Sequence, residues 1–153
     1  MNNSKQIWVW VGVVVVVAAV AAAFIWKPAP TTQPPTATST SPAPVYAPQG
    51  QLVPEFPKDL IIDDAAAISG SYSIGYSSTT NQYTAKYNSS STVTSLYNQY
   101  KTYLYNNSWT ITGSLTTRPT FDAISASQGS STLQVVISKM SKGSEVTITY
   151  VVK

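Results

Sequence analysis

The hydrophobic residues of this 153-residue chain follow two patterns, one continuous and one periodic. The continuous run covers residues 7–26, which contain no charge, no proline and a single glycine. At about 1.5 Å per helical residue, this run spans roughly 30 Å, the thickness of the hydrocarbon core of a bilayer. It therefore predicts a transmembrane helix that binds the lipid bilayer.

The residues that flank this run fit the same interpretation. Tryptophan is enriched where a helix crosses the membrane surface, and a neighbouring lysine extends its ammonium group into water. The run carries such anchors at its two ends: Lys5, Trp8, Trp10, Trp26 and Lys27. The alternative is a signal peptide cleaved near Ala23, which would give a secreted protein. The apolar stretch continues to Trp26 and is longer than the roughly 7–15 residues of a signal-peptide core, which favours the anchor.

A proline-rich segment follows the apolar run. Residues 27–57 hold nine of the ten prolines, interleaved with Thr and Ser. Because proline lacks a backbone donor and biases the preceding residue toward extended conformations, we expect a flexible Pro/Thr/Ser-rich stalk. Residues 1–6 are too few to form a domain, so we expect them to be a short cytoplasmic tail. This arrangement predicts an N-terminus inside the cell and a C-terminal domain outside it.

Periodic patterns begin in the last part of the chain, residues 58–153, which we expect to be a small extracytoplasmic domain. Within 91–107, apolar residues recur at helical spacing and form one stripe, which predicts an amphipathic helix. The stripe consists of Val93, Leu96, Tyr97, Tyr100 and Leu104. One face of this helix should therefore be buried against the rest of the domain.

Alternating apolar and polar residues predict strands on both sides of this helix. The alternating segments are 82–87, 109–115, 121–128, 133–137 and 146–152. The last two are expected to form a hairpin through 141–144, and 59–63 to add a short edge strand, whereas 65–78 fit no single pattern. This order predicts an α+β domain of two layers. An antiparallel sheet would carry one helix on one face, in a β-β-α-β-β-β-like arrangement.

Composition narrows the possible chemistry. The chain has no Cys and no His, which removes disulfides, thiolate and imidazole metal sites, and Ser-His-Asp or Cys-His catalysis. The formal net charge is +3, but two of the nine basic residues, Lys5 and Lys27, belong to the membrane anchor. Since no cluster of Lys or Arg remains in the domain, we expect no nucleic-acid partner.

The acidic residues do not predict a catalytic or metal site. Asp63 and Asp64 are the only adjacent pair, and no D-x-D-x-D-G spacing surrounds them, so we expect a solvated turn and no metal or other cofactor. A carboxylate-dependent envelope hydrolase is a remote alternative, because glycoside hydrolysis uses two carboxylates and nothing in the sequence brings two together. We therefore expect a protein that is not an enzyme.

Tyrosine is the one enrichment that suggests binding, with ten residues in the chain. At about 100° per helical residue, Tyr105 points away from the apolar stripe. Together with Tyr72 and Tyr76, it is a candidate exposed aromatic patch for sugars or a protein partner. Tyrosine also fills core edges in many proteins, and that structural role is the competing interpretation.

Several of these residues form a wider pattern. The segment V-P-E-F-P at 53–57 precedes the apolar residues 60–62, the predicted helix contains Tyr100 and Leu104, and Trp109 opens the next strand. This order resembles small membrane-anchored bacterial envelope domains of unknown function, in which a P-x-x-P segment precedes a helix of the form Y-x-x-x-L-x-x-x-G-W. The chain departs from that pattern at Ser108, which stands in place of the glycine. The resemblance implies a helix with closing antiparallel strands, and it implies no catalytic residue.

These features together predict a single-pass membrane-anchored envelope protein. Its small non-catalytic domain would bind an envelope protein or a cell-wall polysaccharide outside the membrane. A structural accessory subunit of a membrane complex is the alternative.

Overall fold

The computed structural model describes residues 42–153. The predicted tail at 1–6, the predicted transmembrane helix at 7–26 with its flanking Lys and Trp residues, and the beginning of the predicted stalk all lie outside the described residues. Within 42–153, no helix is both long enough and apolar enough to cross a bilayer.

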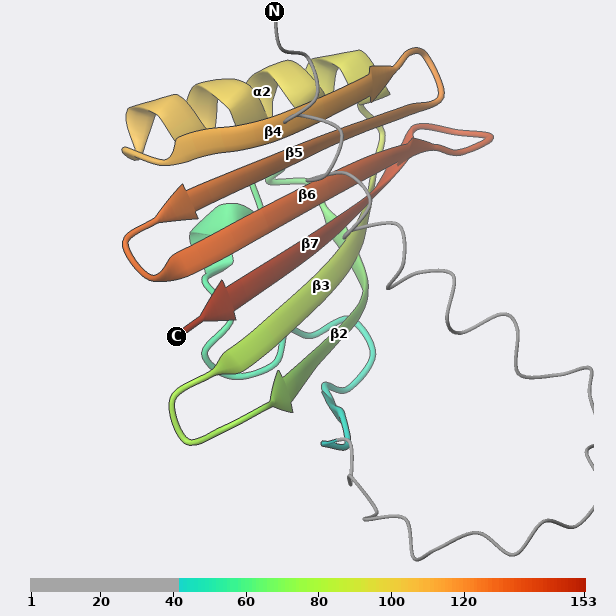
Figure 1. The fold of residues 1–153 in the computed structure, drawn as a ribbon. Helices are drawn as coiled ribbons and strands as arrows, with labels where there is room; N and C mark the ends of the chain where they lie inside the picture. Colours follow the sequence, from blue (N-terminus) through green and yellow to red (C-terminus); the bar gives the residue numbers. More distant parts are fainter. Residues whose placement is uncertain (1–41) are drawn as a thin grey trace, which may run out of the picture. The chain divides into compact units, whose positions relative to one another are not determined.

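An antiparallel sheet of seven strands and one α-helix make up the described part, so the α+β prediction is confirmed (Figure 1). The strands are β1 Val45–Tyr46, β2 Ala67–Gly75, β3 Asn81–Ser89, β4 Thr110–Thr117, β5 Phe121–Gln128, β6 Ser131–Lys139 and β7 Ser144–Val152. Their order in the sheet is β1-β2-β3-β7-β6-β5-β4, and every pair of neighbours is antiparallel. Four strands follow the helix, as the four alternating segments predicted, although the β-β-α-β-β-β-like arrangement counts only three, and the last strand joins the two halves of the sheet.

Helix α2 extends over Val93–Asn106 and packs against β4, β5 and β6 (Figure 1). The hydroxyl of Thr92 caps its first turn by accepting the backbone N–H of Ser95 at 3.2 Å. All five residues of the predicted stripe are buried. The helix therefore lies where its apolar period directs it, with the stripe toward the sheet.

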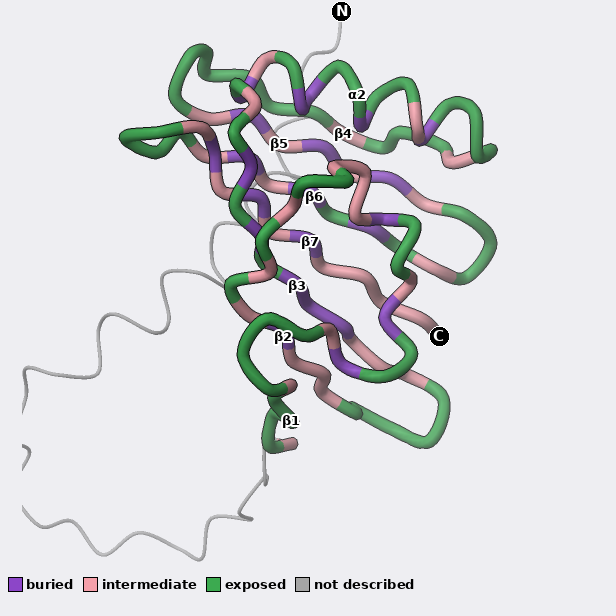
Figure 2. Tube along the Cα trace, turned by 180° about the vertical axis from the view of Figure 1, so that it is seen from behind, coloured by how far each residue is buried: buried purple, intermediate pink, exposed green. Residues whose placement is uncertain are grey.

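The segment before β2 covers the part of the same sheet face that α2 does not reach (Figure 2). Val53, Phe56 and Leu60 are at most 4% exposed and join the helix stripe in one hydrophobic core. The backbone N–H of Val53 also donates to the buried Ser71 hydroxyl at 3.1 Å. The boundary predicted at residue 58 therefore lies inside the packed structure, because apolar side chains between the prolines pack against the sheet.

The edge strand predicted at 59–63 is wrong. A 3₁₀ helix, η1, occupies Lys58–Leu60 instead. The side chain of Leu60 is buried, and its carbonyl accepts the Tyr100 hydroxyl at 2.9 Å. That carbonyl is thus bonded to a side chain and not to a neighbouring strand. The residues at 65–78, which fitted no pattern, contain β2, whose alternation is interrupted by a register shift between Ile68 and Gly70.

Candidate functional site

The three tyrosines of the predicted aromatic patch do not come together. Tyr105 is 83% exposed on α2, which packs on β4, β5 and β6. Tyr72 lies on β2, where its ring packs against that of Tyr46 with 5.6 Å between centroids, and Tyr76 directly follows the same strand. Strands β3 and β7 separate β2 from the strands beneath the helix (Figure 1). Tyr72 and Tyr76 are therefore at one edge of the sheet and Tyr105 is near the other.

Two adjoining hollows lie along α2, one from its first turn to its end and the other beside its C-terminal end. The first, of about 560 Å³, we name the amide groove; its polar lining includes Ser95, Asn98, Gln99, Thr102, Asn106 and Asn107. The second, of about 190 Å³, we name the aromatic hollow; its lining includes Asp59, Tyr103, Asn107, Trp109, Gln128 and Tyr150. Tyr103 and Asn107 line both hollows, so the two form one continuous surface.

The C-terminal end of α2 fixes the position of Trp109. The backbone N–H of Trp109 donates to the carbonyl of Leu104 at 2.9 Å, and that of Ser108 donates to Tyr105 at 3.3 Å. These two bonds form a Schellman closure, which needs a left-handed residue just after the helix. Ser108 has this conformation, with φ of 59°, at the position where the resembling pattern has glycine.

The sheet supplies the second aromatic side chain of the hollow. Tyr150 of β7 lies 6.3 Å from Trp109 between ring centroids, at an interplanar angle of 72°. Its other neighbour is Tyr83 of β3, directly opposite in the register, with 6.3 Å between centroids and 27° between planes. Edge-to-face and stacked pairs at these separations are favourable for aromatic rings. Two strands, β3 and β7, and the end of the helix thus hold a row of three aromatic rings.

Hydrogen bonds fix the polar groups around this row. The Tyr103 hydroxyl donates to Asp59 Oδ2 at 2.6 Å, and Asn107 Nδ2 donates to the carbonyl of Tyr103 at 2.8 Å. Gln128 Nε2 donates to the carbonyl of Asn107 at 2.9 Å, which ties β5 to the helix end. Burial, and then the hydrogen bond to Asp59, raise the pKa of Tyr103, so this hydroxyl stays protonated as a donor at neutral pH.

Charge is nearly absent from both hollows. Asp59 is the one charged residue that lines either of them. Within residues 42–153, the one ion pair joins Arg118 and Asp122, so Asp59 has no cationic partner there. The site is therefore an uncharged, amide-rich groove that leads to an aromatic hollow with a single negative charge.

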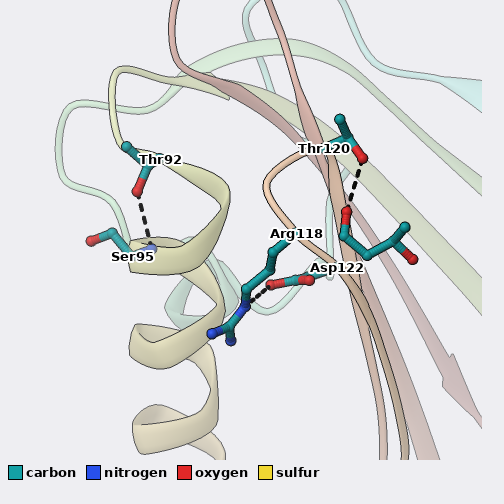
Figure 3. A network of polar contacts seen from close by, with 6 residues as sticks. Thr92, Ser95, Arg118, Thr120 and Asp122 are labelled. Atoms are coloured by element: carbon teal, nitrogen blue, oxygen red, sulfur yellow. Dashed lines mark hydrogen bonds and ion pairs between the residues drawn. The ribbon is translucent and has the colours of Figure 1, made fainter.

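A second polar cluster, near the start of α2, is closed (Figure 3). Arg118 Nε donates to Asp122 Oδ2 at 3.1 Å, and the guanidinium lies 5.0 Å from the Tyr97 ring centroid. Asp122 is fully buried, and its Oδ1 has no hydrogen-bond partner within the described residues. Since the carboxylate has no exposed surface, we assign this cluster to the fold and not to a binding site.

Asp63, the first residue of the acidic pair at 63–64, stabilises a turn. Asp63 Oδ1 accepts the backbone N–H of Ala65 at 3.0 Å, and its Oδ2 accepts the Ser89 hydroxyl. This is the local bonding by which aspartate stabilises turns. Nowhere in 42–153 do three or more Asp or Glu residues gather as a metal site would require.

The sequence reasoning missed the residues that make this site. It assigned Trp109 and Tyr150 to strands by their alternation, and it placed Asp59 in an edge strand. One signal was present: Trp109 directly follows the predicted helix end, and tryptophan is enriched at binding surfaces because its side chain has an apolar body and a polar N–H. No protein-family model, curated protein or solved structure matches the chain, so function is inferred from the geometry of the site itself.

Proposed function

We propose that this chain is a single-pass membrane-anchored envelope protein whose domain binds a cell-wall polysaccharide outside the membrane without catalysis. The apolar run at 7–26 is the anchor and the proline-rich segment after it is the tether. One observation carries the proposal: the amide groove and the aromatic hollow form one surface through Tyr103 and Asn107.

The chemistry of this surface matches that of a sugar polymer. Aromatic rings present large apolar faces at low entropic cost, and these suit the apolar face of a pyranose ring. The Asn and Gln side chains each offer donors and an acceptor, as sugar hydroxyls require. An extended groove that continues from an aromatic anchor accommodates successive units of one chain. Binding of a polymer therefore uses the whole surface, whereas a small metabolite would use only part of it.

The carboxylates favour binding over hydrolysis. Glycoside hydrolysis uses two carboxyl groups that flank one bond, separated by about 5–9.5 Å. Asp59 is the one carboxylate that lines the two hollows. Its Oδ2 is already bonded to the Tyr103 hydroxyl. The residues at the site thus support recognition, and they do not supply an acid and base pair.

Retention of the full chain, held in detergent micelles, on insoluble wall polysaccharide tests this function. Trp109→Ala should weaken retention by about tenfold or more, because it removes an aromatic anchor from the site. Tyr105→Ala is the matched control, since Tyr105 is an exposed aromatic residue that lines neither hollow. Thermal unfolding of both variants is measured alongside. Equal retention of wild type and folded Trp109→Ala would contradict the proposal.

The membrane topology has its own test. Protease added to intact cells should cut the proline-rich segment and release the domain, because both lie outside in this proposal. A segment that stays uncut in unglycosylated protein, but is cut after the cells are opened, would place the domain inside.

A second candidate function, a structural accessory subunit of a membrane complex, is favoured by strand β4. This strand is an edge of the sheet, and its sequence contains neither charge nor proline. Ile111 and Leu115 on it are 38% and 52% exposed. Such an edge can accept a strand from a partner. Leu115→Lys should abolish co-purification of one membrane protein if this function holds, and should leave wall-polysaccharide retention unchanged.

A further inference from the structure

We infer that the aromatic hollow recognises the free amino group of a deacetylated amino sugar within the bound polysaccharide. This inference rests on the proposed function and names the sugar unit at one end of the site. Three aromatic side chains, Tyr103, Trp109 and Tyr150, line the hollow together with the carboxylate of Asp59, and no Lys or Arg lines it. Aromatic faces beside one negative charge form the surroundings that an ammonium group prefers.

The hydrogen bonds inside the domain leave the hollow rich in acceptors. Asn107 and Gln128 each donate one of their two amide N–H groups to a backbone carbonyl, at 2.8 Å and 2.9 Å, and their side-chain oxygens accept no bond within the described residues. The Tyr103 hydroxyl donates its hydrogen bond to Asp59 Oδ2. No group within 42–153 donates to Asp59 Oδ1, Asn107 Oδ1 or Gln128 Oε1. An ammonium group has three donors and no acceptor, so it complements these oxygens better than an acetamide does.

The charge of Asp59 is available to such a ligand. Asp59 is exposed and forms no ion pair within the described residues. Its one side-chain partner there is the neutral Tyr103 hydroxyl, which orients the carboxylate without cancelling its charge. A charge-assisted bond from an ammonium group is about twice as strong as a bond between neutral groups. The hollow should therefore distinguish a free amine from its acetylated form.

The shape of the site favours a sugar amine over a lysine side chain. The hollow holds about 190 Å³, and it opens through Tyr103 and Asn107 onto the uncharged amide groove of about 560 Å³. A ring with hydroxyls fits this continuation, because the groove offers amides and hydroxyls along its whole length.

Calorimetric titration of the full chain in detergent micelles tests the inference. The two probes are the β-1,4-linked tetramers of glucosamine and of N-acetylglucosamine. The glucosamine tetramer should bind about tenfold tighter, as a charge-assisted hydrogen bond predicts. Asp59→Asn should remove this difference, since asparagine keeps an acceptor for Tyr103 but loses the charge. Asp64→Asn, at an exposed turn aspartate that lines neither hollow, should preserve it.

The remaining outcomes separate this inference from the proposed function. Equal affinity for the two tetramers, with both lost in Trp109→Ala, overturns amine recognition and leaves polysaccharide binding standing. Absence of binding to either tetramer, while wall polysaccharide is still retained, also overturns amine recognition alone. Tighter binding of trilysine than of the glucosamine tetramer overturns it in favour of a protein ligand. Absence of binding to the tetramers and to wall polysaccharide overturns both.

Discussion

Two carboxylates near opposite ends of α2 have contrasting surroundings. Asp122, near the start of the helix, is fully buried and bonded to the guanidinium of Arg118. Asp59, near the end of the helix, is exposed and bonded to the neutral hydroxyl of Tyr103. One charge is cancelled inside the fold, and the other is oriented at the rim of a hollow.

The difference shows what each end of the helix can do. A buried charge is costly unless a cation and hydrogen bonds compensate it, and Arg118 is the cation that compensates Asp122 within the described residues. An exposed carboxylate remains solvated, so it does not require a cationic partner. Asp59 therefore contributes little to folding, and its charge stays available to a ligand. Loss of the Asp122 ion pair should therefore lower the free energy of unfolding more than loss of the Asp59 carboxylate does. Loss of the Asp59 carboxylate should weaken ligand binding more.

The largest effect is expected for Arg118→Ala. This change leaves the buried Asp122 carboxylate without its cation, which should lower the free energy of unfolding by about 3 kcal/mol. Urea denaturation at pH 7 measures the loss. The double variant Arg118→Met with Asp122→Leu should recover most of it, because no buried charge remains. A loss in Arg118→Ala below about 1 kcal/mol would mean that Asp122 is compensated in another way.

The second largest effect on the free energy of unfolding is expected at alkaline pH, through a buried tyrosine pair at the middle of α2. Tyr87 and Tyr100 are both fully buried, and their hydroxyls lie 3.0 Å apart. Burial raises the pKa of Tyr87 to about 12 and raises that of Tyr100 further. These two tyrosines ionise near pH 10 in the unfolded chain and stay protonated at that pH in the folded chain. Their contribution to the free energy of unfolding is therefore constant below pH 10 and falls above it.

The slope of that fall is about 1.4 kcal/mol per pH unit for each such tyrosine between pH 10 and pH 12. Urea denaturation at pH 9, 10 and 11 measures it. Tyr87→Phe should reduce this slope by the amount that one buried tyrosine contributes. An unchanged slope in this variant would show that Tyr87 ionises equally in the folded and unfolded chain.

A smaller effect is expected at the helix cap. Thr92→Ala removes the acceptor of the Ser95 backbone N–H and should lower the free energy of unfolding by about 1 kcal/mol. Thr92→Ser, which keeps the hydroxyl, is the matched control and should retain most of the stability. Polysaccharide binding should be the same in both variants, because Thr92 lines neither of the two hollows of the site. Weaker binding in Thr92→Ala would mean that the cap is needed to position Ser95, which lines the amide groove.

The smallest effect on stability is expected for Asp59→Asn. The residue is exposed and asparagine retains an acceptor for Tyr103, so the free energy of unfolding should change by less than about 0.5 kcal/mol. Thermal and urea unfolding check this value. A loss comparable with that of Arg118→Ala would remove the contrast between the two carboxylates.

The parts of the fold that could be predicted from the sequence depend on local periodicity. The helix stripe from Val93 to Leu104 is buried in full because its spacing places it on one face. The alternating segments in β3, β5, β6 and β7 bury one face in the same way, whereas β4 formed a strand without burying its alternating residues. Residues 59–63 were misassigned because the Leu60 side chain packs in the core and its carbonyl accepts the Tyr100 hydroxyl, and no local pattern encodes these tertiary contacts.

The candidate site depends on long-range register instead. Asp59, Trp109 and Tyr150 come from three separate parts of the chain. The register of β7 with β3 and β6 places Tyr150, the end of α2 places Trp109, and the Tyr103 hydroxyl bonds to Asp59. The sequence did predict the orientation of Tyr105, which is exposed as its helical angle requires. It could not predict that Tyr72 and Tyr76 lie at the far edge of the sheet, since strand order is a tertiary property.

The most direct test of polysaccharide recognition is an NMR titration of the isotope-labelled full chain in micelles with solubilised wall polysaccharide. Trp109 is the one tryptophan within 42–153, so its indole N–H signal reports on the aromatic hollow. We expect this signal and the side-chain amides of Asn98, Gln99 and Gln128 to shift together, with no shift along β4. Shifts confined to β4, or no shift at Trp109 at saturating polysaccharide, would contradict the proposed site.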